Sequence, residues 1–366
     1  NQETSRSQKD QPVLNKEQKQ VIDEIKSNQS FKPWLIHGVT ASGKTEIYMN
    51  LIMEFLKGSQ NQALVLVPEI NLTPQLEERF QNRFFDKKIV VLHSYLSNIE
   101  RLDNWREAKI GNADIVIGTR LGVFTPMPNL KIIIIDEEHD TSFKQSEGLR
   151  YHARDVAMMR AKNLNIPIIM GSATPSLETW YKAFNAKQNF RYLKLNSRAV
   201  DNATLPVIKT IQVNDKTKLE VSMQVIDAIQ NRIDKQEQTI VFINRRGYSP
   251  VLICSSCGWV AKCERCSSRL VVHLRKKRLK CHHCGFDQKI TNACVECGNT
   301  DLFPLGTGTQ KIEDVLKYHF SKAKIERVDR DTTHSKKSIE DLYLKMNNRE
   351  IDIVIGTQML AKGHDF

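Results

Sequence analysis

Short apolar runs alternate with amphipathic stretches along most of this 366-residue chain. Six runs in the first half are candidate strands because they are short and apolar on both faces: residues 34–36, 63–67, 89–92, 114–117, 131–135 and 166–170. Strands that are hydrophobic on both sides and separated by helical patterns are typical of a parallel sheet covered by helices. The first half of the chain is therefore predicted to be an α/β domain.

A second α/β region follows a stretch in which the pattern weakens. Residues 185–219 show little periodicity and suggest a connector, whereas a helix near 221–233 and a strand at 239–243 begin a new alternation. The six residues Asp-Ile-Val-Ile-Gly-Thr occur at 114–119 and again at 352–357. Each copy ends in Gly-Thr at the carboxyl end of a buried strand, which is where parallel sheets bind ligands. We therefore expect two related lobes that face one cleft.

These patterns give a domain plan. Residues 1–13 are polar, have no apolar periodicity and are expected to form a linker. The first lobe is predicted at 14–200, the connector at 201–218 and the second lobe at 219–366, with a cysteine-rich insertion at 252–302.

A glycine-rich segment follows the first predicted strand and opens a helix from residue 44 to about residue 57. Its residues are Gly38, Val39, Thr40, Ala41, Ser42, Gly43, Lys44 and Thr45. The backbone N–H groups of such a turn, together with the N-terminus of a helix, bind phosphate. The lysine of this motif reaches the β- and γ-phosphates of ATP, and the hydroxyl after it binds Mg²⁺. We interpret the segment as an ATP site.

Carboxylates at the end of an isoleucine-rich strand support this interpretation. Asp136 and Glu137 directly follow residues 131–135 and are followed by Glu138 and His139. At this strand end Asp136 is suited to hold Mg²⁺, usually through water, and Glu137 to position and deprotonate the attacking water. A solvated acidic turn would also accommodate these carboxylates, but the phosphate loop upstream favours the catalytic interpretation.

All eight cysteines occur as Cys-x-x-Cys pairs in one short window: Cys254/Cys257, Cys263/Cys266, Cys281/Cys284 and Cys294/Cys297. Each pair places two thiolates on one tight turn, so two pairs can complete a tetrahedral Zn²⁺ site. A disulfide framework is typical of small secreted domains, and we find no signal peptide or apolar membrane run in this sequence. An iron–sulfur cluster is the closer alternative, although paired knuckles in even number favour zinc. We expect two Zn²⁺ sites, and the spacing fits both sequential and nested pairing.

The charge balance points to a polyanionic partner. Lys and Arg number 54 against 42 Asp and Glu, which gives a formal net charge of +12 and an isoelectric point near 9.2. This balance suits nucleic-acid binding, although a merely solvated basic surface has the same net charge. A basic run between the second and third cysteine pairs suits a phosphate backbone or a solvated hairpin: Arg275, Lys276, Lys277, Arg278 and Lys280. The cysteine usage indicates a reducing cytoplasm.

Several of these motifs, taken in order, resemble those of superfamily 2 helicases. They are residues 38–45, 136–139, the Gly-Ser-Ala-Thr-Pro segment at 171–175 and the Gly-Thr-Gln segment at 356–358. With four cysteine pairs in the second lobe, the chain is similar to the family of primosomal protein N′, the replication-restart helicases. Segments 147–155, 244–248 and 356–365 add to this resemblance, which covers residues 14–366. It implies an α/β fold of two RecA-like parallel-sheet lobes with a zinc-binding insertion in the second lobe.

The resemblance also implies roles for individual residues. Gln18 is placed like a glutamine that binds adenine. Contact with DNA, or its coupling to ATP hydrolysis, is implied for Thr119, Arg120, Phe143, Tyr151, His152, Ser172 and Thr174, with further backbone contacts at Pro68 and Thr73. The aromatic side chains among them can stack on bases, and ordinary packing is the alternative. In the family the zinc sites are nested: one ion is held by Cys254, Cys257, Cys294 and Cys297, and the other by Cys263, Cys266, Cys281 and Cys284.

The implied function is that of an ATP-dependent 3′–5′ DNA helicase or translocase that acts at stalled or forked DNA to restart replication through primosome assembly. The implied cofactors are ATP, Mg²⁺ and two Zn²⁺. The implied partners are forked or single-stranded DNA, single-stranded-DNA-binding protein, and primosome and helicase-loader proteins, with no membrane, in a bacterial cytoplasm. An RNA helicase or duplex translocase of the same superfamily is one alternative. A non-catalytic, zinc-stabilised scaffold that docks loader proteins is another.

The family's pattern has two further parts that these motifs do not include. Members carry an N-terminal DNA-binding region, which does not precede residue 14, and an arginine-bearing motif that completes the ATP site, which would follow residue 366. We therefore expect the helicase core of a longer protein. Because such an arginine often contributes about 10³-fold or more to the rate, these residues alone are expected to hydrolyse ATP slowly.

Overall fold

The computed structural model describes residues 12–58, 60–68, 74–94, 96–146, 148–185, 189–199, 206–211, 221–243, 251–273, 277–281, 283–305, 309–328 and 336–356. The chain separates into two compact units between Val207 and Ile208, within the segment predicted to be the connector. Some predicted features lie outside the described residues: Thr73, Glu147, Arg275, Lys276 and the segments 1–11, 244–248, 306–308 and 357–366. Among the described helices, none combines the length and apolar composition needed to cross a membrane.

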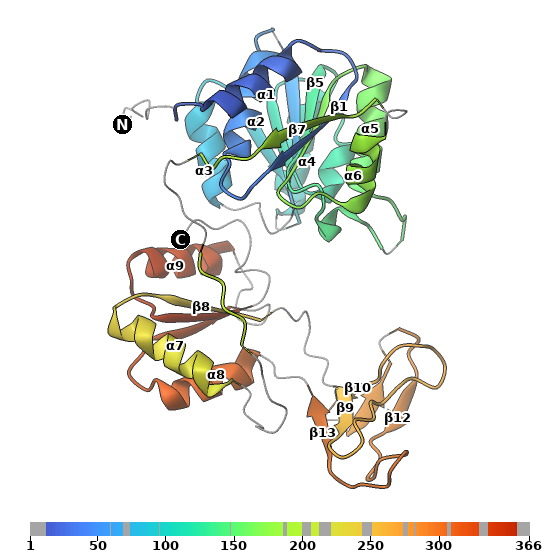
Figure 1. The fold of residues 1–366 in the computed structure, drawn as a ribbon. Helices are drawn as coiled ribbons and strands as arrows, with labels where there is room; N and C mark the ends of the chain where they lie inside the picture. Colours follow the sequence, from blue (N-terminus) through green and yellow to red (C-terminus); the bar gives the residue numbers. More distant parts are fainter. Residues whose placement is uncertain are drawn as a thin grey trace. The chain divides into compact units, whose positions relative to one another are not determined.

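The first unit is built on a seven-stranded parallel sheet in the order β3-β4-β2-β5-β6-β1-β7 (Figure 1). The strands are β1 (Pro33–Gly38), β2 (Gln62–Leu66), β3 (Ile89–Leu92), β4 (Ile115–Gly118), β5 (Leu130–Ile135), β6 (Ile168–Ser172) and β7 (Arg191–Leu195). Each of the six runs predicted in this half forms a strand, which confirms the α/β class. The weak periodicity of 185–219 was misleading at β7, because an edge strand exposes alternate residues and buries only Leu193 and Leu195.

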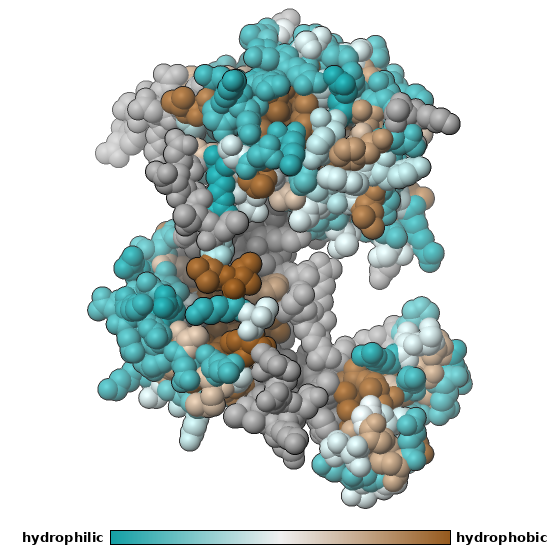
Figure 2. Space-filling model, viewed as in Figure 1, coloured by the Kyte–Doolittle hydropathy of each residue, from teal (hydrophilic) through white to brown (hydrophobic). Residues whose placement is uncertain are grey.

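Helices cover both faces of this sheet. They are α1 (Lys16–Lys26), α2 (Lys44–Phe55), α3 (Pro74–Arg83), α4 (Asn98–Lys109), α5 (Ala153–Leu164) and α6 (Leu177–Phe184), with short 3₁₀ turns η2 (Arg120–Phe124) and η3 (Thr141–Phe143). Residues of α1, α2 and α3 share one core cluster with Ala63 and Val65 of β2, whereas α4, α5 and η2 share another with Leu64 and Leu66. Successive strand residues point to opposite faces, so one strand serves both cores. The visible surface of this unit is mainly hydrophilic, with scattered hydrophobic residues (Figure 2).

The second unit contains two sheets. A parallel sheet has the order β14-β15-β8, and an antiparallel sheet, which carries the cysteines, has the order β12-β11-β10-β9-β13. The elements are α7 (Met223–Asp234), β8 (Thr239–Phe242), β9 (Val251–Cys254), β10 (Val271–His273), β11 (Arg278–Lys280), β12 (Asp287–Lys289), β13 (Leu302–Leu305), α8 (Thr309–His319), β14 (Ile325–Val328), α9 (Lys336–Asn347) and β15 (Ile353–Gly356). The cysteine-rich sheet is thus an insertion between β8 and α8, as the sequence predicted.

The repeated sequence occupies equivalent places in the two parallel sheets. β4 lies between β3 and β2, and β15 lies between β14 and β8, with matching registers. In the first sheet, Asp114 accepts a hydrogen bond from the Lys88 backbone N–H at 2.8 Å and donates its own backbone N–H to the Lys88 carbonyl at 2.9 Å. Asp352 and Lys324 make the same two bonds at 2.7 and 2.9 Å. The repeat is therefore a structural repeat as well as a sequence repeat.

Candidate functional site

The phosphate loop lies between β1 and α2, where the sequence predicted it. Ala41 and Gly43 have φ of +63° and +77°, and Gly43 is the N-cap of α2. The side chain of Lys44 is folded back over the loop, where its Nζ donates to the carbonyl oxygen of Gly38 at 3.1 Å. A helix N-terminus with a lysine over a tight turn is suited to bind a phosphate group.

Two side chains hold the loop in this form. The Nε2 of Gln18 donates to the Ser42 carbonyl at 2.9 Å, and its Oε1 accepts from the backbone N–H of Asn15 at 2.9 Å. A Cβ on Gly43 would lie 2.3 Å from the Gln18 amide and would displace that side chain from the loop, and the φ of +77° by itself favours glycine. The hydroxyl of Ser42 is fully buried and has no hydrogen-bond partner among the described residues. A bound phosphate would satisfy such a group, so the loop fits a nucleotide.

The acidic strand end lies beside this loop. Asp136 directly follows β5, and its backbone N–H donates to the Leu66 carbonyl at 2.9 Å. The hydroxyl of Tyr48, on α2, donates to Asp136 Oδ1 at 3.1 Å. The pKa of Asp136 is raised to about 6, mainly by burial and then by the negative charge of Glu137, while the positive charge of Lys44 opposes the shift. Burial and the neighbouring carboxylates hold the pKa of Tyr48 well above its usual value, so the phenol is a neutral donor.

Glu137 leads from this strand end to the segment that follows β6. It has a φ of +47°, and its Oε2 lies 3.4 Å from His139 Nδ1. The same His139 nitrogen lies 2.8 Å from Ser172 Oγ, which also accepts the backbone N–H of Thr174 at 2.9 Å. The structure thus brings Ser172 and Thr174 into contact with the Asp-Glu segment. These contacts join Glu137 to the segment after β6 through His139 and Ser172.

A buried ionic cluster beside Glu137 is a feature that the sequence did not reveal. Glu138 is fully buried and lies 2.8 Å from Arg154 Nη1. Its oxygens also accept from the backbone N–H of Ser176 at 2.7 Å and from the hydroxyl of Thr179 at 2.7 Å. The third acid of the motif therefore ties the end of β5 to α5 and α6. The sequence alone does not show that Glu138 is buried in an ion pair while Asp136 and Glu137 belong to the candidate ATP site, because all three are carboxylates that follow one strand.

The residues proposed to contact DNA have different surroundings. Phe143 is fully buried in the core, so packing is its role in this structure. Tyr151 is partly buried and makes an edge contact with Phe124, with ring centroids 5.0 Å apart. His152 is the N-cap of α5 and accepts from the Arg154 backbone N–H at 3.3 Å. Burial and the charge of Arg154 lower the pKa of His152.

The loop that contains these aromatic residues is anchored by Arg120. Its Nη1 donates to the carbonyls of Ser142 and Lys144 at 2.9 and 3.2 Å. Thr119 precedes it and is buried, and Pro68 is buried as well. In the described residues Arg120 is therefore a link between η2 and the aromatic loop. Phe124, which is half exposed and was not singled out from the sequence, offers more ring surface than Phe143.

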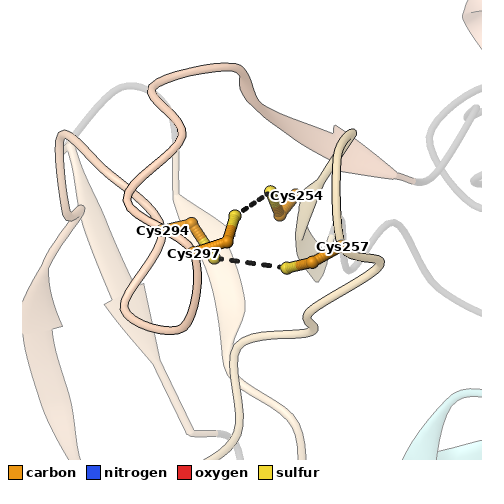
Figure 3. A group of neighbouring side chains, drawn as sticks. All are labelled: Cys254, Cys257, Cys294 and Cys297. Carbon is orange, nitrogen blue, oxygen red and sulfur yellow. Dashed lines mark hydrogen bonds between the residues drawn. The ribbon is translucent and has the colours of Figure 1, made fainter.

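The eight cysteines form two groups of four in the nested order. Cys254, Cys257, Cys294 and Cys297 make one group, shown in Figure 3, and Cys263, Cys266, Cys281 and Cys284 make the other. Their thiols are free, and the sulfur–sulfur distances are 3.6 Å for Cys254–Cys297 and Cys257–Cys294. A tetrahedron with Zn–S bonds of about 2.3 Å has edges of roughly 3.8 Å, whereas a disulfide needs about 2.05 Å. The donor set and its spacing fit one Zn²⁺ in each group.

The turns that carry the thiols explain the glycines beside them. Gly258, Gly285 and Gly298 each follow the second cysteine of a pair and have φ between +72° and +78°. A Cβ would meet nothing within 4 Å at any of them, so conformation rather than space requires glycine. Backbone N–H groups of Cys257 and Cys284 lower the pKa of Cys254 to about 7 and that of Cys281 to about 6. Such N–H donors stabilise the thiolate form that binds metal.

Comparison with known proteins agrees with this geometry. Residues 15–183 match the DEAD/DEAH box helicase family, and residues 263–289 match the family described as PriA DNA helicase Cys-rich region (CRR) domain. The chain is 44% identical over 354 residues to Replication restart protein PriA of Haemophilus influenzae, a match that covers 97% of this chain and 48% of that protein. It is 40% identical over 350 residues to Replication restart protein PriA of Bacillus subtilis, covering 94% and 43%.

The chain spans about half the length of the curated relatives that it matches. Among solved structures, it is similar to the DEAD-box helicase Mss116 bound to ssRNA and UDP-BeF, with a TM-score of 0.56 and 14% identity. That match covers 97% of this chain and 63% of the other. At this identity the likeness establishes the two-lobed helicase fold.

Proposed function

Because this chain belongs to the family of replication restart protein PriA, we propose that it is the ATP-driven core of a DNA helicase that moves 3′ to 5′ at forked DNA and promotes replication restart. The observation that carries the proposal is the pairing of two features in one chain. The phosphate loop lies beside the Asp136–Glu137 strand end, and the second unit carries two Cys₄ groups. We take residues 14–200 and 219–366 as its two lobes, 201–218 as the connector and 252–302 as the insertion.

The residues of the first lobe have distinct parts in ATP hydrolysis. Lys44 neutralises charge on the β- and γ-phosphates, and backbone N–H groups from Gly38 to Thr45 surround them. Thr45 and Asp136 hold Mg²⁺, which when bound spreads the charge of the transferred phosphoryl group. Glu137 orients the attacking water and accepts its proton. Gln18, whose amide already supports the loop, contacts the adenine.

Coupling to DNA is assigned to the chain of contacts that starts at Glu137. His139, Ser172 and Thr174 link the catalytic carboxylate to the segment after β6. Thr119, Arg120, Tyr151 and His152 place the loop that contacts the strand, with Phe143 as its buried support. ATP binding closes the two lobes and hydrolysis reopens them, so that the DNA groove advances along one strand.

The cysteine groups and the partners complete the proposal. Each Cys₄ group holds one Zn²⁺ and shapes the insertion, which separates strands and docks primosome and helicase-loader proteins. Single-stranded-DNA-binding protein is a further partner at the fork. Free thiols in metal-binding geometry suit the reducing bacterial cytoplasm, where we place the protein.

The test is nucleic-acid-stimulated ATP hydrolysis by the full-length protein, with zinc measured on the same sample. We expect forked DNA to stimulate more than duplex DNA or RNA, Lys44→Ala to abolish hydrolysis, and about two zinc ions per chain. Lys57→Ala is the matched control, because Lys57 lies just beyond α2 and is exposed. Stronger stimulation by RNA would make the protein an RNA helicase, and preference for plain duplex a duplex translocase. If Lys44→Ala retained biological activity and loader binding, a scaffold would be the better description.

A further inference from the structure

We propose that the buried hydroxyl of Tyr48 positions the carboxylate of Asp136 for Mg²⁺, which makes Tyr48 a positioning residue of the ATP site. The inference rests on the proposed function, since it takes Asp136 as the Mg²⁺-holding carboxylate. It adds a side chain that lies outside the loop motif and the acidic motif. Its basis is a contact among three elements, α2, β5 and β6.

The position of Tyr48 on α2 brings its hydroxyl to the strand end. It lies four residues after Lys44, so both side chains lie on one side of the helix. The Tyr48 side chain is 1% exposed, and its hydroxyl donates to Asp136 Oδ1 at 3.1 Å. A phenol has one O–H group that can donate a hydrogen bond, and here the Asp136 carboxylate accepts it. One oxygen of Asp136 is thereby fixed, and the orientation of the other, which would be left to hold Mg²⁺ or its water, is fixed with it.

Gly171 on β6 provides the space for this hydroxyl. A Cβ at Gly171 would lie 1.6 Å from Tyr48 Oη and 2.8 Å from its Cζ, a separation that real atoms do not show. The φ of Gly171 is not in the left-handed region, so space, rather than backbone conformation, explains the glycine. Its carbonyl also accepts the backbone N–H of Glu138 at 3.1 Å. The strand that makes room for Tyr48 therefore also holds the acidic segment in place.

This arrangement predicts a specific defect when the hydroxyl is removed. Tyr48→Phe keeps the ring that packs in the core and removes only the donor. The Asp136 carboxylate then rotates more freely. Binding Mg²⁺ must fix its orientation again, and this loss of conformational entropy lowers the affinity for the metal. Losing part of the free energy of a hydrogen bond to a charged acceptor typically changes a binding constant, here that for Mg²⁺, by about three- to tenfold. The defect should be in the Mg²⁺ requirement, while DNA binding without nucleotide is unaffected.

The experiment measures Mg²⁺ titrations of fluorescent ATP-analogue binding and of forked-DNA-stimulated ATP hydrolysis on the full-length protein. We expect Tyr48→Phe to need about three- to tenfold more Mg²⁺ in both assays. The variant should still melt in one cooperative transition, at a moderately lower temperature, because a buried acceptor loses its donor. Tyr192→Phe is the matched control and should behave as wild type. It removes a hydroxyl of the same unit that lies 2.8 Å from His37 Nδ1 and takes no part in the ATP site.

Gly171→Ala gives a second approach, since its Cβ displaces the Tyr48 hydroxyl, and it should raise the Mg²⁺ requirement in the same direction. A wild-type Mg²⁺ requirement for nucleotide binding in Tyr48→Phe would overturn the proposal, whatever the fate of Gly171→Ala. The binding titration also separates this proposal from the proposed function. A wild-type protein that binds Mg²⁺–ATP but does not hydrolyse it would refute the motor, and the Tyr48→Phe titration would still decide the positioning role.

Discussion

Replacing Arg154 by alanine should destabilise the first unit far more than any surface arginine does. The Arg154 side chain is 8% exposed and that of Glu138 is 0% exposed, and their charged atoms are 2.8 Å apart. The same Nη1 atom lies 2.6 Å from Ser176 Oγ and 3.0 Å from Thr179 Oγ1. Removing Arg154 therefore leaves a buried carboxylate without its cation. Removal of one partner from a buried pair typically costs about 3–5 kcal/mol.

The structure places the expected cost near the lower end of this range. Glu138 keeps three donors after the substitution: the Ser176 backbone N–H, the Ser176 hydroxyl and the Thr179 hydroxyl. These bonds retain part of the stabilisation of its charge, so about 3 kcal/mol is the expected loss. In a unit of roughly 200 residues, each kcal/mol lowers the melting temperature by about 2–4 °C. The melting temperature of the first unit should therefore fall by about 6–12 °C.

The assay is thermal melting of the full chain, with Arg191→Ala as the matched control. Arg191 forms an ion pair with Glu24 at 3.2 Å in the same unit, but the side chains are 56% and 33% exposed. Exposed pairs contribute about 0–1 kcal/mol, so Arg191→Ala should melt within about 4 °C of wild type. Arg154→Lys should fall between the two because it keeps the charge but loses the planar set of donors. Equal melting temperatures for the two alanine variants would refute the argument that burial makes the Glu138–Arg154 pair costly to break.

Three further predictions concern the ATP site and the cysteine groups. The folded pKa of Asp136 is about 6, above its usual value near 3.9, so the native state binds more protons between these values. The stability that this proton contributes is present below about pH 4 and is lost as pH rises through 6. The free energy of unfolding, measured by denaturant titration at pH 4.5 and 6.5, should therefore fall less between these pH values in Asp136→Asn than in the wild type. Cys257→Ser should lower zinc content from about two to about one per chain by atomic absorption, while Ser256→Ala should leave it unchanged. Gly43→Ala should weaken ATP binding at least about tenfold, because the added Cβ would lie 2.3 Å from the Gln18 amide and displace it from the phosphate loop. Gly298→Ala is the control, since Gly298 has a similar φ but open space around it. It should cost about 1–2 kcal/mol of stability and leave ATP binding intact.

Among the described strands of the first unit, the sequence identified six and missed β7. β5, for example, is an almost uninterrupted isoleucine run, and such a run has few alternatives to a central parallel strand. β7 alternates buried and exposed residues at the sheet edge and is only five residues long. Its pairing with β1 comes from the fold, because no residue of β7 by itself indicates a partner.

The candidate site also contains some residues that sequence motifs identify and others that only tertiary contacts identify. The loop and acidic motifs are recognisable because their chemistry fixes both residue type and spacing. Tyr48, Gly171 and Arg154 are different, since each acts through a contact between elements that are far apart in sequence. A tyrosine on an apolar helix, a glycine in a strand and an arginine near a helix start are all common. Only the tertiary structure shows that they surround Asp136 and Glu138.

The repeated hexapeptide corresponds to a structural repeat whose first residue is an aspartate. A ligand at its Gly-Thr end stays a prediction, and the described residues show what its first residue does. Asp114 and Asp352 each hold the backbone of a lysine, Lys88 or Lys324, that precedes the neighbouring strand.

A second pair of equivalent residues extends the argument. Gln62, next to the start of β4 in the first sheet, donates to the carbonyls of Ala108 and Ala113 at 3.1 and 2.8 Å. Gln238 stands at the same place in the second sheet and donates to the carbonyls of Met346 and Ile351 at 3.0 and 2.8 Å. Each glutamine thus joins the helix before the repeated strand to the residue two positions ahead of that strand. Because the two lobes share this polar framework around their central strands, the repeat reflects a common way of fixing strand register, on which each lobe carries different chemistry.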